Sequence, residues 1–220
     1  MMEAINRLLN RMERAIRRFA IPNLMLYVTA GMLGVFVLDY IVPYTSVSSW
    51  LSLNMAKIAQ GQVWRLVTFI FMPPSTSLLW IVFSLYFYYL IGQTLERQWG
   101  SARFNLFYLI GMLGAILSAV CTGYGANTYL NMSLFLAFAA IYPDFQLMVF
   151  FILPVKIKWL ALADLLLLAW MFLTGTWSAR LGIVFALLNV ILFFGGDALR
   201  TLRQQASYWK TRRNFRKQTW

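Results

Sequence analysis

Few residues in this chain could carry out chemistry, and the commonest catalytic side chain is absent. The 220-residue sequence contains no histidine and a single cysteine, Cys121. The missing histidine removes the usual general base, the usual zinc ligand and every Ser-His or Cys-His mechanism. One cysteine forms neither an internal disulfide nor a thiolate metal cluster. We therefore expect no metal site and no cofactor.

The remaining candidates are polar side chains inside long apolar runs. Asn131 and Ser133 lie in the sequence YLNMSLFLAF, and Asn189 lies in a later run. In a membrane helix such groups hydrogen-bond a neighbouring helix, a contact worth about 0.6 kcal/mol on average. They could also bind a partly unfolded client helix that enters from the side. Bonding to a neighbouring helix is the simpler interpretation.

Asp164 is the one carboxylate within these later apolar runs. A carboxylate near the centre of a bilayer costs about 2.5–3.5 kcal/mol on insertion scales. The side chain therefore needs a partner or a cavity. Because Asp164 follows Lys158 by only six residues, we expect an ion pair with a basic residue near the interface rather than a proton or ion path.

The composition excludes an ordinary soluble domain. Hydrophobic residues make up 61% of the chain, charged residues make up 12%, and the mean hydropathy is +0.67. Average soluble domains are about 45–50% apolar and about 25% charged. Because a membrane-spanning helix uses roughly 20 residues, the length allows six spans joined by short loops.

Apolar segments indicate an all-α polytopic membrane protein with six transmembrane helices. The expected spans are residues 24–42, 77–95, 104–123, 128–142, 159–174 and 180–196. A further apolar stretch at residues 145–154 is too short to cross. We interpret it as an interfacial or re-entrant piece, or as part of a longer, bent fourth span.

The positive charge is concentrated at the two ends of the chain, which carries a net charge of +12. Residues 1–20 place arginines opposite an apolar face, which predicts an amphipathic basic helix lying in the membrane interface. Residues 21–196 form the expected membrane domain, and residues 197–220 form a basic cytoplasmic tail. Anionic membrane lipids are the expected partner, at about 1 kcal/mol per cation near the surface, and nucleic acid is not.

The same charges predict the orientation. With the N-terminus in the cytoplasm, only Lys57, Arg65 and Arg180 of the 19 lysines and arginines fall on the outer side. The positive-inside rule therefore places both termini in the cytoplasm. We expect an integral, multi-pass protein of a bacterial cytoplasmic membrane.

The longest connection, residues 43–76, is apolar and aromatic. Trp50, Trp64 and Phe69 suit the level of the lipid headgroups, and an amphipathic piece is expected around residues 51–58. Arg65 can anchor this loop by hydrogen-bonding backbone carbonyls. Such a loop either lies on the membrane or covers a binding site.

The order of four motifs resembles the rhomboid family of six-span intramembrane serine proteases and their inactive relatives. The resemblance covers roughly residues 24–196. It is carried by these matches: GQVWRL at 61–66, with the loop anchor Trp64 and Arg65; Gly92, Glu96 and Gly100 in a G-x-x-x-E-x-x-x-G pattern; LPVKIKWLA at 153–161; and Gly182 with Ala186. At the second of these, Glu96 with Arg97 and Arg103 predicts an ion-pair network.

The resemblance implies a serine that opens the fourth span, a histidine on the sixth, and a histidine and an asparagine on the second. The second-span positions fall on Trp80 and Ser84, and the serine position falls on Asn127 or Thr128. The sixth-span histidine position falls on Ala179 or Arg180. None of these residues restores the mechanism, and losing the base costs a triad hydrolase of order 10⁶ in rate.

We therefore expect no enzyme but a rhomboid pseudoprotease, similar to Derlins in lacking the catalytic residues. It would bind or escort transmembrane client proteins for quality control, assembly or delivery to other factors. The candidate client-binding residues are Asn127, Thr128, Asn131 and Ser133. One alternative is a small transporter or lipid-remodelling protein that uses Asp164 and the polar face of the fourth span. Another is a residual enzyme with Ser133 as a displaced nucleophile. The sequence leaves the oligomeric state open.

Overall fold

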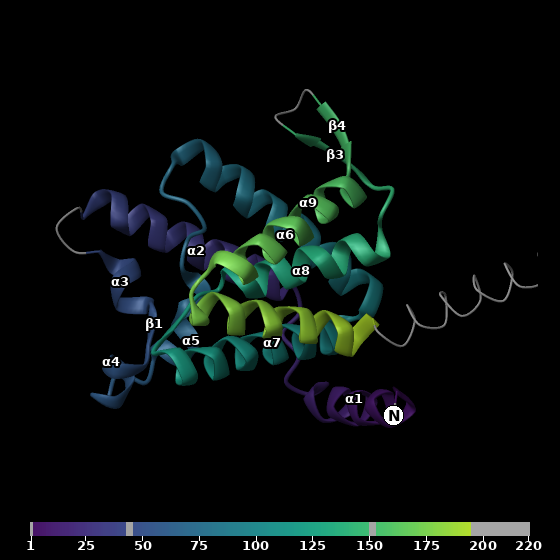
Figure 1. Ribbon diagram of the computed structural model, residues 1–220, viewed down its shortest axis with the longest axis horizontal. Coiled ribbons are helices and arrows are strands. Elements are labelled where there is room, and N and C mark those ends of the chain that lie inside the picture. Colours follow the sequence, from purple (N-terminus) through teal and green to yellow (C-terminus); the bar gives the residue numbers. More distant parts are fainter. Residues whose placement is uncertain (1, 43–45, 150–152, 195–220) are drawn as a thin grey trace, which may run out of the picture.

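A computed structural model describes residues 2–42, 46–149 and 153–194, and this part of the chain is mostly helical (Figure 1). Five of its helices are long and apolar enough to cross a membrane. They are α2 (Leu24–Ile41), α6 (Leu78–Trp99), α7 (Ser101–Thr122), α9 (Ile157–Thr174) and the Trp177–Phe194 helix. The chain is therefore an integral, multi-pass membrane protein.

The expected fourth span is shorter than a membrane crossing. This helix, α8 (Thr128–Ile141), has 14 residues, and its length of about 21 Å falls short of the roughly 30 Å hydrocarbon core. Six full spans are thus not confirmed. Helix α8 can be short because other helices surround it and neither of its ends has to reach the lipid headgroups unaided.

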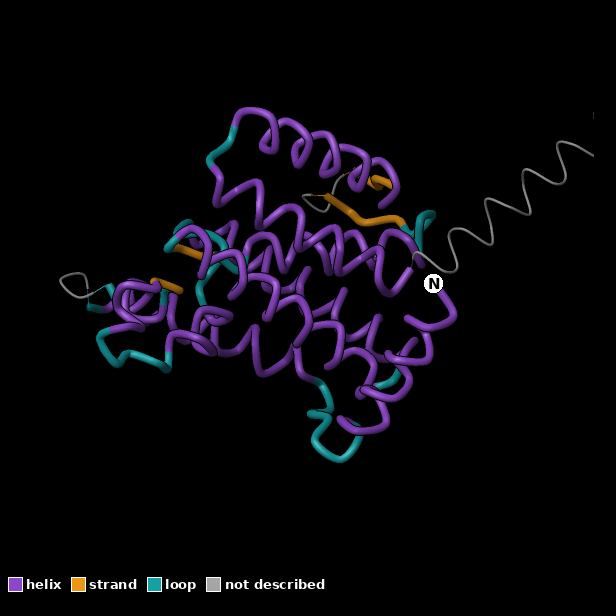
Figure 2. Tube along the Cα trace, turned by 60° about the horizontal axis from the view of Figure 1, so that its bottom comes forward, coloured by secondary structure: helices purple, strands orange, loops and turns teal. Residues whose placement is uncertain are grey.

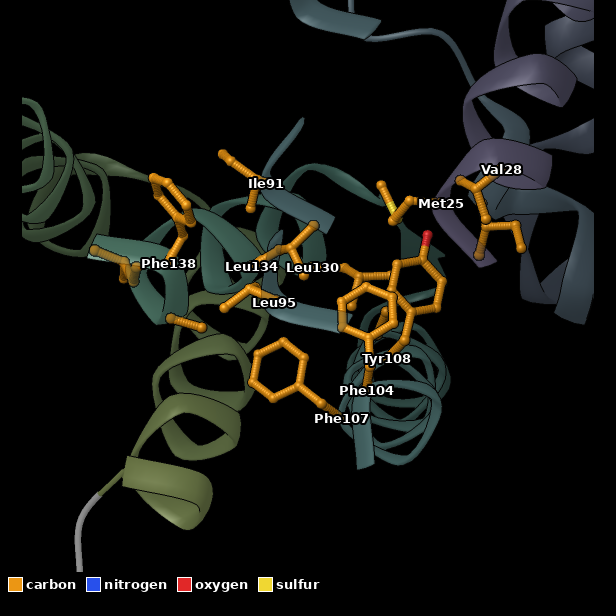
Figure 3. Packing of buried hydrophobic residues seen from close by; sticks show 14 of the residues in the cluster. Met25, Val28, Ile91, Leu95, Phe104, Phe107, Tyr108, Leu130, Leu134 and Phe138 are labelled. Carbon is orange, nitrogen blue, oxygen red and sulfur yellow. The ribbon is translucent and has the colours of Figure 1, made fainter. Parts of the chain in front are cut away.

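The core of the molecule is built around α8. Its buried residues lie on every side of the helix, as a helix in the centre of a bundle requires. They are Leu130, Asn131, Ser133, Leu134, Leu136, Ala137, Phe138 and Ala139. Figure 3 shows Leu130, Leu134 and Phe138 gathered with side chains of α6 and α7. Helices α6, α7 and α9 all pack against α8.

Glycines bring the helix backbones close together at several crossings. A Cβ atom on Gly92 of α6 would meet Cβ and Cγ of Met25 on α2. A Cβ on Gly111 of α7 would meet Leu130 of α8, and one on Gly182 would meet the ring of Tyr129. Small residues at such contacts drive helix association in lipid, where van der Waals packing replaces the hydrophobic effect.

The long connection between α2 and α6 contains short helices and a strand. Its elements are α3 (Val47–Leu51), β1 (Leu53–Asn54), α4 (Met55–Ala59), α5 (Arg65–Thr68) and η1 (Phe69–Phe71). Strand β1 pairs antiparallel with β2 (Tyr124–Gly125), which precedes α8. The expected amphipathic piece at residues 51–58 is therefore interrupted by a strand. This pairing fixes the connection beside the start of α8.

The segment before α9 is a β-hairpin and not an extension of the fourth span. Strands β3 (Gln146–Val149) and β4 (Leu153–Lys156) pair antiparallel, with Gln146 opposite Lys156. Asp144 accepts a hydrogen bond from Lys158 at 3.1 Å and lies 3.6 Å from the Lys156 amine. The hydrogen bond and charge of Lys158 lower the pKa of Asp144. These exposed charges indicate that the base of the hairpin lies outside the hydrocarbon. The fold is mostly helical, as expected of an all-α membrane protein, and two small two-stranded sheets accompany the helices.

Helix α1 (Met2–Ile16) lies beside α7 (Figure 1). Leu9 is buried against the bundle, while Leu8 and Phe19 leave apolar surface exposed. The Asn105 side-chain amide donates a hydrogen bond to the Ile21 carbonyl at 2.9 Å and holds the chain that follows α1 on α7. The basic tail expected at residues 197–220 lies outside the described residues.

Substitution of Gly92 tests the close approach of α2 and α6. Gly92→Ala should lower the free energy of unfolding by about 1–3 kcal/mol, because Met25 would have to move. Gly34→Ala on α2 is the matched control, since nothing lies within 4 Å of its Cβ position. This control should be neutral or gain up to about 1 kcal/mol of helix propensity. Thermal unfolding in detergent measures both, and equal effects would contradict the close packing.

Candidate functional site

A cavity of about 220 Å³ lies where α7, the β2 segment, α8 and the Trp177–Phe194 helix meet. Small and hydroxyl-bearing side chains dominate its wall. The lining residues are Gly111, Ala115, Ser118, Tyr124, Gly125, Ala126, Tyr129, Leu130, Ser133, Thr176, Ser178, Ala179, Gly182, Phe185 and Ala186. The cavity is therefore polar enough to hydrogen-bond a ligand, although four membrane-embedded or loop elements enclose it.

Ser133 is the candidate client-binding residue that lines this cavity. Its side chain is fully buried, and its hydroxyl donates a hydrogen bond to the Leu130 carbonyl at 2.7 Å. Within the described chain, the lining residues include no carboxylate, amine, imidazole or thiol. The site can thus exchange hydrogen bonds, but its lining supplies no group that would take a proton from Ser133 near neutral pH.

Ala179 and Arg180 have different surroundings. Ala179 lines the cavity together with Ser133. The Arg180 guanidinium donates a hydrogen bond to the Leu173 carbonyl at 3.1 Å and lies 5.3 Å from the ring centroid of Trp177. Arg180 is thus engaged at the end of α9. Of the two positions that the resemblance offers for the histidine, Ala179 is the one that lines the cavity.

Asn127 joins the start of α8 to the preceding loop. It is buried at the N-terminal boundary of α8, and its side-chain amide donates hydrogen bonds to the carbonyls of Ile70 at 3.3 Å and Met72 at 2.9 Å. Thr128, the first residue of α8, is exposed. Neither residue lines the cavity. The amide hydrogens of Asn127 are used in the bonds to Ile70 of η1 and to Met72, which follows η1.

The other resemblance-derived positions also lie off the cavity wall. Trp80 on α6 is half exposed and packs edge-on against Phe83, and Ser84 is partly buried on the same helix. Asn131 is buried in α8, but its side-chain oxygen has no hydrogen-bond partner. The structure therefore places Ser133 and Ala179 on the cavity wall and leaves Trp80, Ser84 and Asn131 off it.

Arg65 fastens the loop between α2 and α6. Its guanidinium is buried and donates hydrogen bonds to the Ser49 and Ser52 carbonyls, both at 2.8 Å, and to the side chain of Gln62 at 2.8 Å. The neighbouring Trp64 is half exposed. The side chain thus links α5 to α3 in the manner expected of an arginine that pairs with backbone carbonyls.

Glu96 is held by polar backbone and a hydroxyl and not by arginines. Its carboxylate accepts hydrogen bonds from the backbone amide of Asn23 at 2.8 Å and from the Ser101 hydroxyl at 2.6 Å. Among the described residues, the ion pairs involve Asp144 and neither Arg97 nor Arg103. The expected ion-pair network is therefore wrong. Glu96 instead ties the start of α2 to the α6–α7 junction, where Gly100 has a φ of +82° that favours glycine.

The sequence analysis did not identify the side of the cavity formed by residues around the start of the Trp177–Phe194 helix. Ser178 donates a hydrogen bond to the Tyr124 carbonyl at 3.1 Å, and Thr122 donates to the Ser178 hydroxyl at 3.3 Å. These contacts join the β2 segment to the start of the last long helix, across more than 50 residues of sequence. The short polar segment between two apolar runs, which contains Thr176 and Ser178, is the signal that could have been used.

Comparison with known families supplies one match. The sequence profile of a family described as eukaryotic integral membrane protein (DUF1751) matches residues 23–193. No curated protein matches the chain. The eukaryotic character of this family contradicts the assignment to a bacterial cytoplasmic membrane, which is therefore wrong. The match covers every described element from α2 to the Trp177–Phe194 helix.

Substitution of Arg65 tests the anchor of the first loop. Arg65→Ala should destabilise this segment by about 2–3 kcal/mol, because the Ser49 and Ser52 carbonyls lose a charged donor. Limited proteolysis of membranes should then cut faster between residues 46 and 68. Lys57→Ala, an exposed cation in the same segment, is the control and should keep the normal rate. Equal cleavage of both variants would contradict an anchoring role.

Proposed function

The chain belongs to the eukaryotic integral membrane protein family DUF1751, and we propose that it is a catalytically inactive, rhomboid-like protein that binds segments of other membrane proteins. The binding serves quality control, assembly or delivery of these clients. The observation that carries the proposal is the hydroxyl-lined cavity at the start of α8. The four motifs between residues 61 and 186 support the rhomboid-like assignment.

The chemistry of the cavity wall indicates what it would bind. The wall combines hydroxyl groups with small apolar side chains. Such a wall suits client side chains or a short unwound stretch of a client. An unwound stretch inside a membrane has unpaired backbone groups that cost several kcal/mol unless they are hydrogen-bonded. Ser118, Ser133 and Ser178 supply hydroxyls for this purpose.

The proposed inactivity follows from the surroundings of Ser133. A serine nucleophile needs an adjacent base within about 2.6–3.2 Å. The Ser133 hydroxyl already donates a hydrogen bond to the Leu130 carbonyl, and Ala179 of the last helix lines the same cavity. A client that reaches the cavity would be bound and released intact.

Filling the cavity should block client binding. Ala179→Phe adds a ring beside Ser133 and should reduce client crosslinking at least tenfold at matched protein level. Crosslinking in native membranes, followed by affinity purification and mass spectrometry, measures the change. Val120→Phe is the matched control, because Val120 is exposed on α7 and does not line the cavity. Unchanged crosslinking in Ala179→Phe would refute binding in this cavity.

Ser133 should not react as a nucleophile. A serine-directed fluorophosphonate should label the wild-type protein no more than Ser133→Ala, because the cavity wall contains no base that would activate the hydroxyl. Intact-protein mass spectrometry in detergent reads the result directly. A phosphonate adduct on Ser133 would overturn the assignment as an inactive protein and favour a residual hydrolase.

A further inference from the structure

Asp164 lies on the face of α9 that packs against α8. The buried residues Ile157, Ala161 and Leu168 recur at helical spacing along α9, and Asp164 falls on the same stripe. Its Oδ2 atom is buried and has no hydrogen-bond partner. Lys158, six residues earlier, lies about 9 Å away along the helix and is hydrogen-bonded to Asp144. The expected ion pair between Asp164 and a basic residue is therefore absent from the described residues.

Two further polar side chains accompany Asp164 inside the bundle. Tyr88 on α6 accepts a side-chain hydrogen bond from the Asn131 amide on α8 and lies close enough to Asp164 to interact with it electrostatically. Asn131 is 2% exposed, and its Oδ1 atom also has no partner. Helices α6, α8 and α9 thus bring Tyr88, Asn131 and Asp164 into one polar cluster, which is separate from the cavity beside Ser133.

The unpartnered atoms indicate which ligand chemistry would fit the cluster. Asp164 Oδ2 and Asn131 Oδ1 are both hydrogen-bond acceptors, and one of them is a carboxylate oxygen. The single phenol proton of Tyr88 can serve only one of them. A ligand that completes the cluster must therefore donate hydrogen bonds, and a positive charge would match the carboxylate.

The depth of the cluster decides how such a ligand arrives. Asp164 lies about 10 Å along α9 from the start of that helix, within a helix long enough to span the membrane. A lysine or arginine in the membrane-spanning segment of another protein is delivered at this depth and needs an acidic partner there. Helix α9 lies at one edge of the bundle (Figure 2), packs on α8, and has few close contacts with α6.

We propose that Tyr88, Asn131 and Asp164 form a recognition site for a basic side chain carried in a client's membrane-spanning segment, which approaches beside α9. This inference rests on the proposed function and adds the class of client: segments whose lysine or arginine lacks its own acidic partner. The carboxylate pairs with the charge, and the Asn131 oxygen accepts a second hydrogen bond.

Designed peptides in lipid nanodiscs test the site with the full-length chain. Fluorescent leucine-based spanning peptides carry Lys, Leu or Glu at the central position, and energy transfer reports binding. The wild-type protein should bind the Lys peptide at least tenfold more tightly than the Leu peptide and should bind the Glu peptide most weakly. Asp164→Asn should remove the preference for Lys, and Asn131→Leu should reduce it.

The control variant is Asp144→Asn, which neutralises an exposed carboxylate outside the cluster and should keep the full preference for Lys. A preference that persists in Asp164→Asn would overturn the recognition site. A second outcome would be equal binding of the Lys and Leu peptides while Ala179→Phe still loses client crosslinking as expected. This result would overturn the recognition site and leave the proposed function standing. Failure of every peptide together with unchanged crosslinking in Ala179→Phe would defeat both.

A free cation is the competing source of the same chemistry. Methylammonium is added during the peptide measurement and in a separate thermal unfolding experiment. If the ligand is carried by a peptide, millimolar methylammonium should neither displace the Lys peptide nor stabilise the protein. Displacement, with thermal stabilisation of the wild type and not of Asp164→Asn, would assign the cluster to a small soluble cation and overturn a client-borne ligand.

Discussion

The close approach of helix backbones to α8 is the interaction on which the rest of this structure depends. Lipid tails are as apolar as leucine, so burying apolar side chains cannot by itself hold the helices together. Contact is instead made where Gly111 admits Leu130 and where Gly182 admits the Tyr129 ring. Both contacts pack against the first turn of α8. Helix α8 has only 14 residues and does not span the membrane, so its own length does not set its depth in the bilayer. These two contacts fix that depth.

The position of α8 explains why polar side chains around it hydrogen-bond to backbone groups. A short central helix begins inside the protein, so the loops that lead into it cannot rely on water to satisfy their carbonyls and amides. Arg65, Asn127 and Glu96 each bond main-chain groups far away in sequence. Three residues that first suggest chemistry or ion pairing thus hold loops and helix ends in place. The cavity beside Ser133 is lined in part by residues 124–126, which lead into α8.

Hydropathy predicted the helices well because the bilayer sets the length of each apolar run. The expected span at residues 24–42 compares with α2 at Leu24–Ile41, and the span at residues 159–174 compares with α9 at Ile157–Thr174. The hairpin before α9 was missed because its two strands lie in one short apolar stretch, which hydropathy does not distinguish from an interfacial or re-entrant piece. The two strands pair through backbone hydrogen bonds, and hydropathy, which depends on side chains, does not predict such bonds.

The candidate site was less predictable for a different reason. Ser133 was chosen from its own span, but its neighbours Ser178 and Ala179 come from another end of the chain, and only the packing of α8 brings them together. The partners of Glu96 were assigned wrongly because Arg97 and Arg103 are near in sequence, whereas the acceptor geometry selects the amide of Asn23 and the Ser101 hydroxyl. Proximity in sequence says little about which donor a buried carboxylate meets.

The two polar regions of the bundle differ in what they leave unfilled. In the cavity, the Ser133 and Ser178 hydroxyls already have acceptors within the protein, so a ligand there adds bonds to a satisfied wall. In the cluster of Tyr88, Asn131 and Asp164, buried acceptors remain without donors. An unsatisfied acceptor in low dielectric is costly, and the cost is relieved by the first donor that reaches it. Under the proposed function, selectivity would therefore come from these unpaired oxygens rather than from the cavity beside Ser133.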